Sequence, residues 1–259
     1  MDNNIIYNLW KYRHLTMKLA ISDFKLRYKN SILGFLWSLI EPLLMLAVMY
    51  VVFTNLMKVN IEHYQLFLLA GIISWNMLSR GTSMGLNSIV GKPSLVKKVY
   101  FPREVLVVSS CITAFLMTLL EFVVFGLFMI IFAVSPTKTV IYFPLIMFAE
   151  LLLIIGISLS LSVLNVYYRD VQYMWGVILQ IGFFATPIMY PISIFPEKYL
   201  HIIRLNPMTE IIDVLRGSLI YSTPPQILDI VHIVGSIFVI LFVGYIIFLK
   251  FEPKLAEEL

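Results

Sequence analysis

Long runs without a charged residue are the feature that most constrains how this chain can fold. Residues 151–168, 171–196 and 230–249 contain no Lys, Arg, Asp or Glu. A helix needs about 20 consecutive apolar residues to cross the hydrocarbon core of a bilayer. Strands of about 10 residues with alternating polarity, the pattern of a membrane β-barrel, are absent from the sequence. The runs therefore predict membrane-spanning helices.

The composition supports an all-α integral membrane protein. Hydrophobic residues make up 60% of the 259 residues, and the mean hydropathy is +0.90. A soluble domain of this length could not bury so much apolar surface. We expect six transmembrane helices, at residues 32–53, 66–86, 105–134, 142–166, 173–190 and 230–249.

The distribution of Lys and Arg indicates the orientation. These residues gather before the first span and in the loop after the second, and short basic loops remain in the cytoplasm. Both termini are expected to be cytoplasmic, in a single transmembrane domain over residues 1–259. It would comprise an interfacial segment at 1–30, the six-span bundle at 31–250 and a tail at 251–259. The basic residues assigned to those two regions are Lys11, Arg13, Lys18, Lys25, Arg27 and Lys29, then Arg80, Lys92, Lys97, Lys98 and Arg103.

The segment before the first span predicts an amphipathic helix at the membrane surface. Its polar residues recur at spacings of three and four, which places them on one helix face. Such a face suits anionic lipid headgroups or a protein partner. The alternative is a segment that only anchors the topology. The stripe consists of Lys11, His14, Lys18, Ser22, Lys25 and Lys29.

Residues 87–104 form a basic loop that suits docking of a cytoplasmic partner, unless it only sets the topology. A short helix can start at Pro93, because proline is tolerated in the first helical turn. Gly91-Lys92-Pro93-Ser94 is only superficially like a phosphate-binding loop. Leu86 stands where that loop needs its first glycine, and proline follows the lysine. We therefore expect no nucleotide-binding loop in this chain.

Two prolines, Pro187 and Pro191, break the fifth span. Proline frees backbone carbonyls, and at membrane depth these must be covered by protein or water. We expect a span that stops early and re-enters from the outer face. Asn206-Pro207 then has the pattern of an N-cap followed by the first helical residue. It predicts a short amphipathic helix at the outer surface, which could act as a gate; the alternative is an ordinary outer loop. Glu210, Asp213 and Arg216 lie off the apolar stripe of this helix. The stripe consists of Met208, Ile211, Ile212, Leu215 and Leu219.

Three acids fall in or near the expected spans: Glu41, Glu121 and Glu150. A carboxylate in lipid is costly enough to be a functional candidate, although a protonated acid can also simply bond neighbouring helices. The single cysteine, Cys111, excludes an internal disulfide, and the isolated histidines lack metal-ligand spacing. We expect no metal site.

Aromatic residues make up 14% of the chain. Sugar rings stack on aromatic faces, so an aromatic-lined passage would suit a glycan. Membrane interfaces also concentrate Trp and Tyr, which leaves the alternative of a simple interfacial belt. The most prominent candidates are Trp37, Trp75, Trp175, Phe183, Phe184 and Tyr190.

A series of short motifs runs in order along the chain. The series is Asp23, Lys25, Arg27-Tyr28, Ser31, Leu33-Gly34, Trp37 and Pro42; Asn87, Lys97-Lys98 and Phe101-Pro102-Arg103-Glu104; Tyr168-Arg169-Asp170; Thr186-Pro187-Ile188 with Tyr190-Pro191; and Asn206-Pro207 with Arg216. Each motif is weak alone, but their order and spacing resemble those of the ABC-2 type transporter permeases, in particular the group that exports O-antigen, teichoic acid and capsule-type polysaccharides.

The resemblance implies a non-enzymatic transport subunit in a prokaryotic cytoplasmic membrane. It would form a homodimer around a channel, bind two copies of a cytoplasmic ABC ATPase and move a lipid-linked glycan. ATP and Mg would bind to the ATPase, this chain would hold no cofactor, and nucleic acid would have no part.

The resemblance also implies site residues. Docking to the ATPase would involve Lys18, Lys25, Lys92, Lys97, Lys98, Arg103 and Glu104. The lipid-linked diphosphate would enter at Arg27, Lys29, Leu33 and Gly34. Candidates for the channel wall are Trp37, Glu41, Trp75, Phe183 and Phe184. The outer gate would contain Pro187, Tyr190, Asn206, Pro207 and Arg216.

Three other functions remain open on the sequence. The first is an exporter of a drug or small lipid with the same fold. The second is a secondary carrier driven by protons through Glu41, Glu121 or Glu150. The third is a membrane enzyme that modifies lipid-linked sugars, which would need acids or histidines clustered at one membrane face, and the sequence clusters none.

Overall fold

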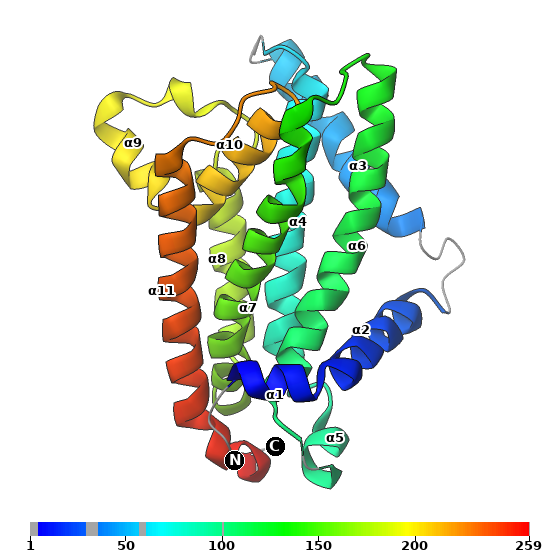
Figure 1. Cartoon of the computed structure of the whole chain (residues 1–259), viewed down its shortest axis with the longest axis vertical. Coiled ribbons are helices and arrows are strands. Elements are labelled where there is room, and N and C mark those ends of the chain that lie inside the picture. The colour runs from blue at the N-terminus through cyan, green and yellow to red at the C-terminus, as the bar shows by residue number, and fades with distance from the viewer. Residues whose placement is uncertain (1–4, 30–35, 57–60, 100, 259) are drawn as a thin grey trace.

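The computed structural model describes residues 5–29, 36–56, 61–99 and 101–258, which form a bundle of helices (Figure 1). In this part of the chain, four helical segments are long and apolar enough to cross a membrane. They are Leu36–Thr54, Glu104–Ile131, Lys138–Tyr167 and Ile227–Phe251. The expected all-helical membrane fold is confirmed.

Two further helices lie in the bundle but differ from these four. α4 (Tyr64–Asn87) has 24 residues and is less apolar, whereas α8 (Val171–Ala185) is apolar but has only 15 residues. The predicted second span lies within α4. The predicted fifth span ends early, because α8 stops at Ala185 and Thr186 is already extended.

α4 is the central helix of the bundle. It packs against α6 (Glu104–Ile131), α7 (Phe143–Tyr167), α8 and α3 (Leu36–Val51), which continues into the π-helix η1 (Val52–Leu56). Small residues permit the close approach: a Cβ added to Gly81 would lie 2.7 Å from Ile154. α11 (Ile227–Phe251) packs along α7, where Gly244 meets the backbone of Gly156.

The two ends of the bundle differ in charge and in structure. α1 (Ile5–Lys11), α2 (Arg13–Tyr28) and α5 (Pro93–Lys98) gather at one end, here named the basic end, together with η4 (Glu252–Lys254) and α12 (Leu255–Glu258). At the far end lie η2 (Lys138–Tyr142), η3 (Ile192–Ile194), α9 (Glu197–Arg204) and α10 (Pro207–Leu219) (Figure 1).

The structure changes three expectations. Tyr12 divides the expected N-terminal helix into α1 and α2. Arg80, assigned by charge to a loop, lies inside α4, where the carboxylate of Glu121 from α6 compensates it. In α10 the expected polar side is largely buried, because Glu210 and Arg216 are each 3% exposed. α10 is therefore an inserted helix, and α9, with Tyr199 and Ile202 exposed, is the surface helix.

Candidate functional site

A cavity lies between α3 and α4. Its volume is about 570 Å³, and its lining combines one indole, one carboxylate and one amide with aliphatic side chains. The Trp37 side chain is 53% exposed, so its indole is accessible from the cavity. Together these groups form an amphipathic groove, which we call the α3–α4 groove. It is lined by Trp37, Glu41, Leu44, Met45, Val48 and Asn76.

A cluster of three charged side chains lies beside this groove. Arg80 of α4 donates from Nη1 to Glu121 Oε1 at 2.6 Å, and its Nη2 lies 3.8 Å from Glu41 Oε2. Glu121 is fully buried and Arg80 nearly so, whereas the Glu41 side chain is 68% exposed. The arginine therefore links α3 to α6 through α4, and only Glu41 presents charge to the groove.

Glu150 belongs to a different part of the core. Its Oε2 accepts a hydrogen bond of 2.9 Å from Ser74 Oγ between α7 and α4, and its side chain is fully buried. Of the three acids singled out in the sequence, Glu41 alone reaches the groove. Glu121 and Glu150 each retain one buried carboxylate oxygen without a hydrogen-bond partner.

α8 packs on another side of α4 through aromatic contacts; in Figure 1, α3 and α8 flank that helix. The indole of Trp175 donates to Thr82 Oγ1 at 2.9 Å. Trp75 is only 7% exposed, packs against Gly182 and meets the ring of Phe183 at 6.1 Å. Phe184, by contrast, is 61% exposed. Trp75 thus packs between helices, while Trp37 and Phe184 remain accessible.

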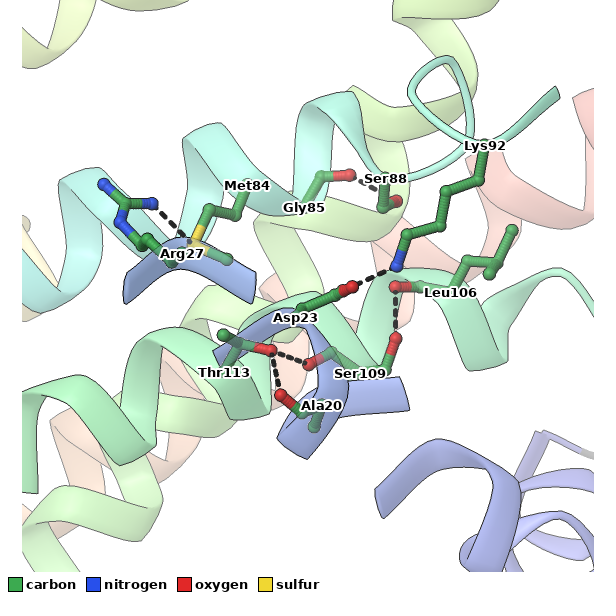
Figure 2. A network of polar contacts seen from close by, with 10 residues as sticks. All are labelled: Ala20, Asp23, Arg27, Met84, Gly85, Ser88, Lys92, Leu106, Ser109 and Thr113. Carbon is green, nitrogen blue, oxygen red and sulfur yellow. Dashed lines mark hydrogen bonds and ion pairs between the residues drawn. The ribbon is translucent and has the colours of Figure 1, made fainter. Parts of the chain in front are cut away.

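At the basic end, α2 lies across α6 and next to the end of α4 (Figure 2). Lys92 Nζ donates to Asp23 Oδ2 at 2.5 Å, with both side chains about one-fifth exposed. Thr113 Oγ1 donates to the carbonyl of Ala20 at 3.2 Å. We call this arrangement the α2 junction; Arg27 extends from it to Met84 Sδ at 3.8 Å.

The expected polar stripe of the N-terminal segment is exposed at every position. The face of α2 opposite the stripe is buried, with Thr16 and Ala20 at its centre. Lys97 and Lys98 at the end of α5 are also exposed, and α5 begins at Pro93 as predicted. The stripe is Lys11, His14, Lys18, Ser22, Lys25 and Lys29.

Glu104, predicted at the docking surface, lies inside the basic end. It is 4% exposed, and its Oε1 accepts a hydrogen bond of 2.9 Å from Asn8 Nδ2 of α1. Burial raises the pKa of the nearby Glu252 carboxyl, the Glu104 carboxylate raises it further, and Arg103 opposes both effects. These groups join α1, α6 and η4. Of the predicted docking residues, Glu104 and Lys92 therefore have partners within the chain, whereas Lys18, Lys25, Lys97 and Lys98 are exposed.

The predicted site for the lipid-linked diphosphate is only partly visible. Leu33 and Gly34 lie outside the described residues. Arg27 and Lys29 at the end of α2 are exposed. Arg27 contacts Met84 near the basic end of α4, one helical turn from Arg80.

At the far end, Arg216 holds the segment that follows α8, residues 186–190, here named the return segment. Its guanidinium donates to three carbonyls: Phe67 at 3.0 Å, Pro187 at 2.7 Å and Ile188 at 2.7 Å. It also lies 3.4 Å from the centre of the Phe67 ring. The carbonyls freed by the broken helix are thus satisfied by a buried cation.

The other predicted gate residues converge on the same segment. Asn206 caps α10 by accepting from Met208 N at 3.1 Å, and its Nδ2 donates to Thr186 Oγ1 at 2.8 Å. Tyr190 donates to the carbonyl of Phe184 at 2.6 Å. Pro207 is the first residue of α10. Sequence reasoning missed Tyr64, whose hydroxyl donates to the carbonyl of Met189 at 2.7 Å, because a lone tyrosine at a span end carries no distinguishing pattern.

The described residues contain no group of three His, Cys, Asp or Glu side chains arranged to hold a metal ion. The groove and the surfaces described above offer hydrogen bonding, aromatic stacking and fixed charge. Such groups can bind and guide a polar substrate. The only cysteine, Cys111, is buried in α6.

Comparisons with known proteins agree with these features. The profile of the ABC-2 type transporter family matches residues 15–220. The chain is 31% identical, over the full length of both proteins, to an O-antigen export system permease protein RfbA of Klebsiella pneumoniae, and 31% identical over 80% of each chain to a protein of that name from Myxococcus xanthus.

A more distant relative is the polysialic acid transport protein KpsM of Escherichia coli. It is 23% identical over 87% of this chain and 89% of its own. Both the family profile and the full-length similarity extend from α2 through the return segment and α10. This chain belongs to the ABC-2 type transporter family, as a membrane permease subunit.

Proposed function

We propose that this chain is the membrane subunit of an ATP-driven exporter of a lipid-linked polysaccharide. The observation that carries the proposal is its full-length similarity to O-antigen export permeases. The α3–α4 groove supports it, because an exposed indole, a carboxylate and an amide can contact sugar rings and hydroxyl groups. Glu121 and Glu150 are fully buried and lie outside the groove lining, which disfavours a proton-driven carrier that works through these two acids.

The working unit is a homodimer with six spans in each copy. α4 and α8 would complete the six, since α4 is long enough to cross a bilayer and α8 is extended by the return segment. The open sides of α3 and α8 would face the second copy and enclose the channel. Trp37, Glu41 and Phe184 would line it, with Trp75 and Phe183 supporting the wall from behind.

The basic end would face the cytoplasm, with both termini on that side of a prokaryotic inner membrane. Short segments rich in Lys and Arg favour this orientation. Two copies of an ABC ATPase, which bind ATP and Mg, would dock there. The exposed Lys97 and Lys98 of α5 and the stripe of α2 with Lys18 and Lys25 supply the contact surface, and Lys92, Arg103 and Glu104 support it from within.

The glycan lipid would enter beside α2 and leave past the far end. Arg27 and Lys29 offer charge to a diphosphate headgroup near the step at Leu33 and Gly34. At the far end, the return segment with Pro187 and Tyr190, and α10 with Asn206, Pro207 and Arg216, would frame the exit. The surface helix α9 would be the part of that exit most free to move.

Deletion of the gene for this permease tests the function. We expect loss of surface glycan and accumulation of the lipid-linked glycan inside the cell, restored by the gene on a plasmid. The purified permease should hydrolyse ATP only when its ATPase partner is added. Normal surface glycan in the deletion strain, together with altered export of a drug or a small lipid, would identify the other export function instead.

A further inference from the structure

The α3–α4 groove has a charge pattern that bears on which glycans can pass. Among the residues that the structure describes, its lining contains Glu41 and no cation. The nearest guanidinium, Arg80, is 10% exposed and held by Glu121 at 2.6 Å. In the cluster of Arg80, Glu41 and Glu121, two carboxylates face one guanidinium. An anion in the groove would therefore meet the Glu41 carboxylate, while Arg80 is already shared between two carboxylates.

The indole of Trp37, which lines the groove, also disfavours an anion there. The face of an indole carries the negative side of its quadrupole, so it attracts cations and apolar C–H groups and repels anions. Trp37 is exposed on the groove next to Glu41, one helical turn away on α3. A sugar stacked on Trp37 would thus present its hydroxyl groups to Glu41 and Asn76.

A carboxylate accepts hydrogen bonds and donates none, whereas the Asn76 amide can do both. Hydroxyl and ammonium groups can donate to Glu41, but a hexuronate carboxylate cannot. We propose that the α3–α4 groove selects neutral or amino-sugar glycans against acidic glycans, and that Glu41 is the residue that sets this selectivity. This inference rests on the proposed export function.

The basic side chains of Arg27 and Lys29, where the lipid carrier would enter, do not conflict with this selectivity. Arg27 and Lys29 are exposed at the end of α2, below the groove and outside its lining. Their charge suits the diphosphate of a lipid carrier, and the charge of that group does not depend on the sugars attached to it. Discrimination between the two would begin only where the sugar chain reaches Trp37 and Glu41.

Paired export assays test the proposal. A strain without its own exporter receives this permease and its ATPase, and makes one of two lipid-linked glycans of equal length, a neutral hexose polymer or the matching polymer with hexuronate. We expect at least about tenfold more surface export of the neutral glycan. Glu41→Gln, which removes the charge at a largely exposed side chain, should raise the ratio of acidic to neutral export at least about threefold.

Glu62→Gln is the matched control, because Glu62 is an exposed acid at the far end, away from the groove. It should leave the ratio unchanged. Equal export of both glycans by the wild-type complex, a preference for the hexuronate polymer, or an unchanged ratio in Glu41→Gln would overturn the proposed selectivity. Failure to export either glycan would instead count against the export function itself.

Binding to the purified complex gives an independent measurement. Quenching of the Trp37 fluorescence, obtained by subtracting the signal of Trp37→Phe, is followed with maltoheptaose and with an oligogalacturonate of equal length. We expect tighter binding of maltoheptaose, and a smaller difference between the two probes in Glu41→Gln. Equal affinities in the wild-type complex would contradict the selectivity.

Discussion

At the scale of single residues, Arg216 replaces hydrogen bonds that the broken fifth span leaves open. Its three donors reach carbonyls of α4 and of the return segment, and its guanidinium lies over the ring of Phe67. Lysine has the same charge but lacks the planar fork. We expect Arg216→Lys to lower the stability of the detergent-purified protein by about 3 kcal/mol, because two or more charged hydrogen bonds are lost. Thermal denaturation should then occur about 6 to 12 °C lower.

Arg204→Lys is the control for this change. Arg204 is about one-third exposed and pairs with Glu210 at 3.6 Å. The melting temperature of the Arg204→Lys variant should therefore stay within about 2 °C of that of the wild type. An equal shift in both variants would show that the three carbonyl contacts do not set the stability of the far end. The sequence placed Arg216 near a gate through its motif, but not inside the protein. Its partners are backbone carbonyls, which every residue has, so no side-chain type in the sequence marks these contacts.

At the scale of elements, the α2 junction joins α2 to α6 and to the loop before α5, and we expect the three to move together. Asp23 and Lys92 form its charged contact. Reversing one charge, as Asp23→Lys or Lys92→Asp, brings like charges together. We expect each single variant to reduce export at least about fivefold with the ATPase still bound, and the double exchange to restore it, since coupling energies of 1 to 3 kcal/mol correspond to about 5- to 150-fold. The measurements are co-purification of the ATPase and surface glycan.

A variant with Lys97→Glu and Lys98→Glu separates docking from coupling, because both side chains are exposed and should affect ATPase recovery directly. Normal export by either single charge reversal would rule out the coupling role. The sequence predicted the exposed stripe of α2 correctly, since helical periodicity reports one face. It could not predict that Lys92 pairs with Asp23, because the contact joins residues 69 positions apart. For the same reason, Lys92 and Glu104 were predicted to be surface residues and have partners inside the chain.

At the scale of the whole molecule, hydropathy predicted the fold class and most of the spans, because lipid requires long apolar helices. It could not predict how α4 is placed. This helix is the centre of the bundle but is less apolar than its neighbours and contains Arg80. The groove likewise depends on how α3 meets α4 in space, so the sequence could name Trp37 and Glu41 as candidates but could not bring Asn76 beside them.

The pairing of Arg80 with Glu121 also leads to an expectation for how the protein enters the membrane. The ribosome releases α4 before α6, so Arg80 reaches the insertion machinery while its carboxylate partner is still unmade. An unpaired arginine costs about 2.5 to 3.5 kcal/mol at a helix centre and less towards the ends, and Arg80 lies in the C-terminal half of α4. α4 should therefore settle in the bilayer only after α6 arrives. We expect Glu121→Ala to leave a larger fraction of chains with α4 uninserted, measured by labelling of cysteines placed on either side of it, and Glu150→Ala to leave that fraction unchanged. On this expectation, α4 and α6 enter the bilayer as a pair.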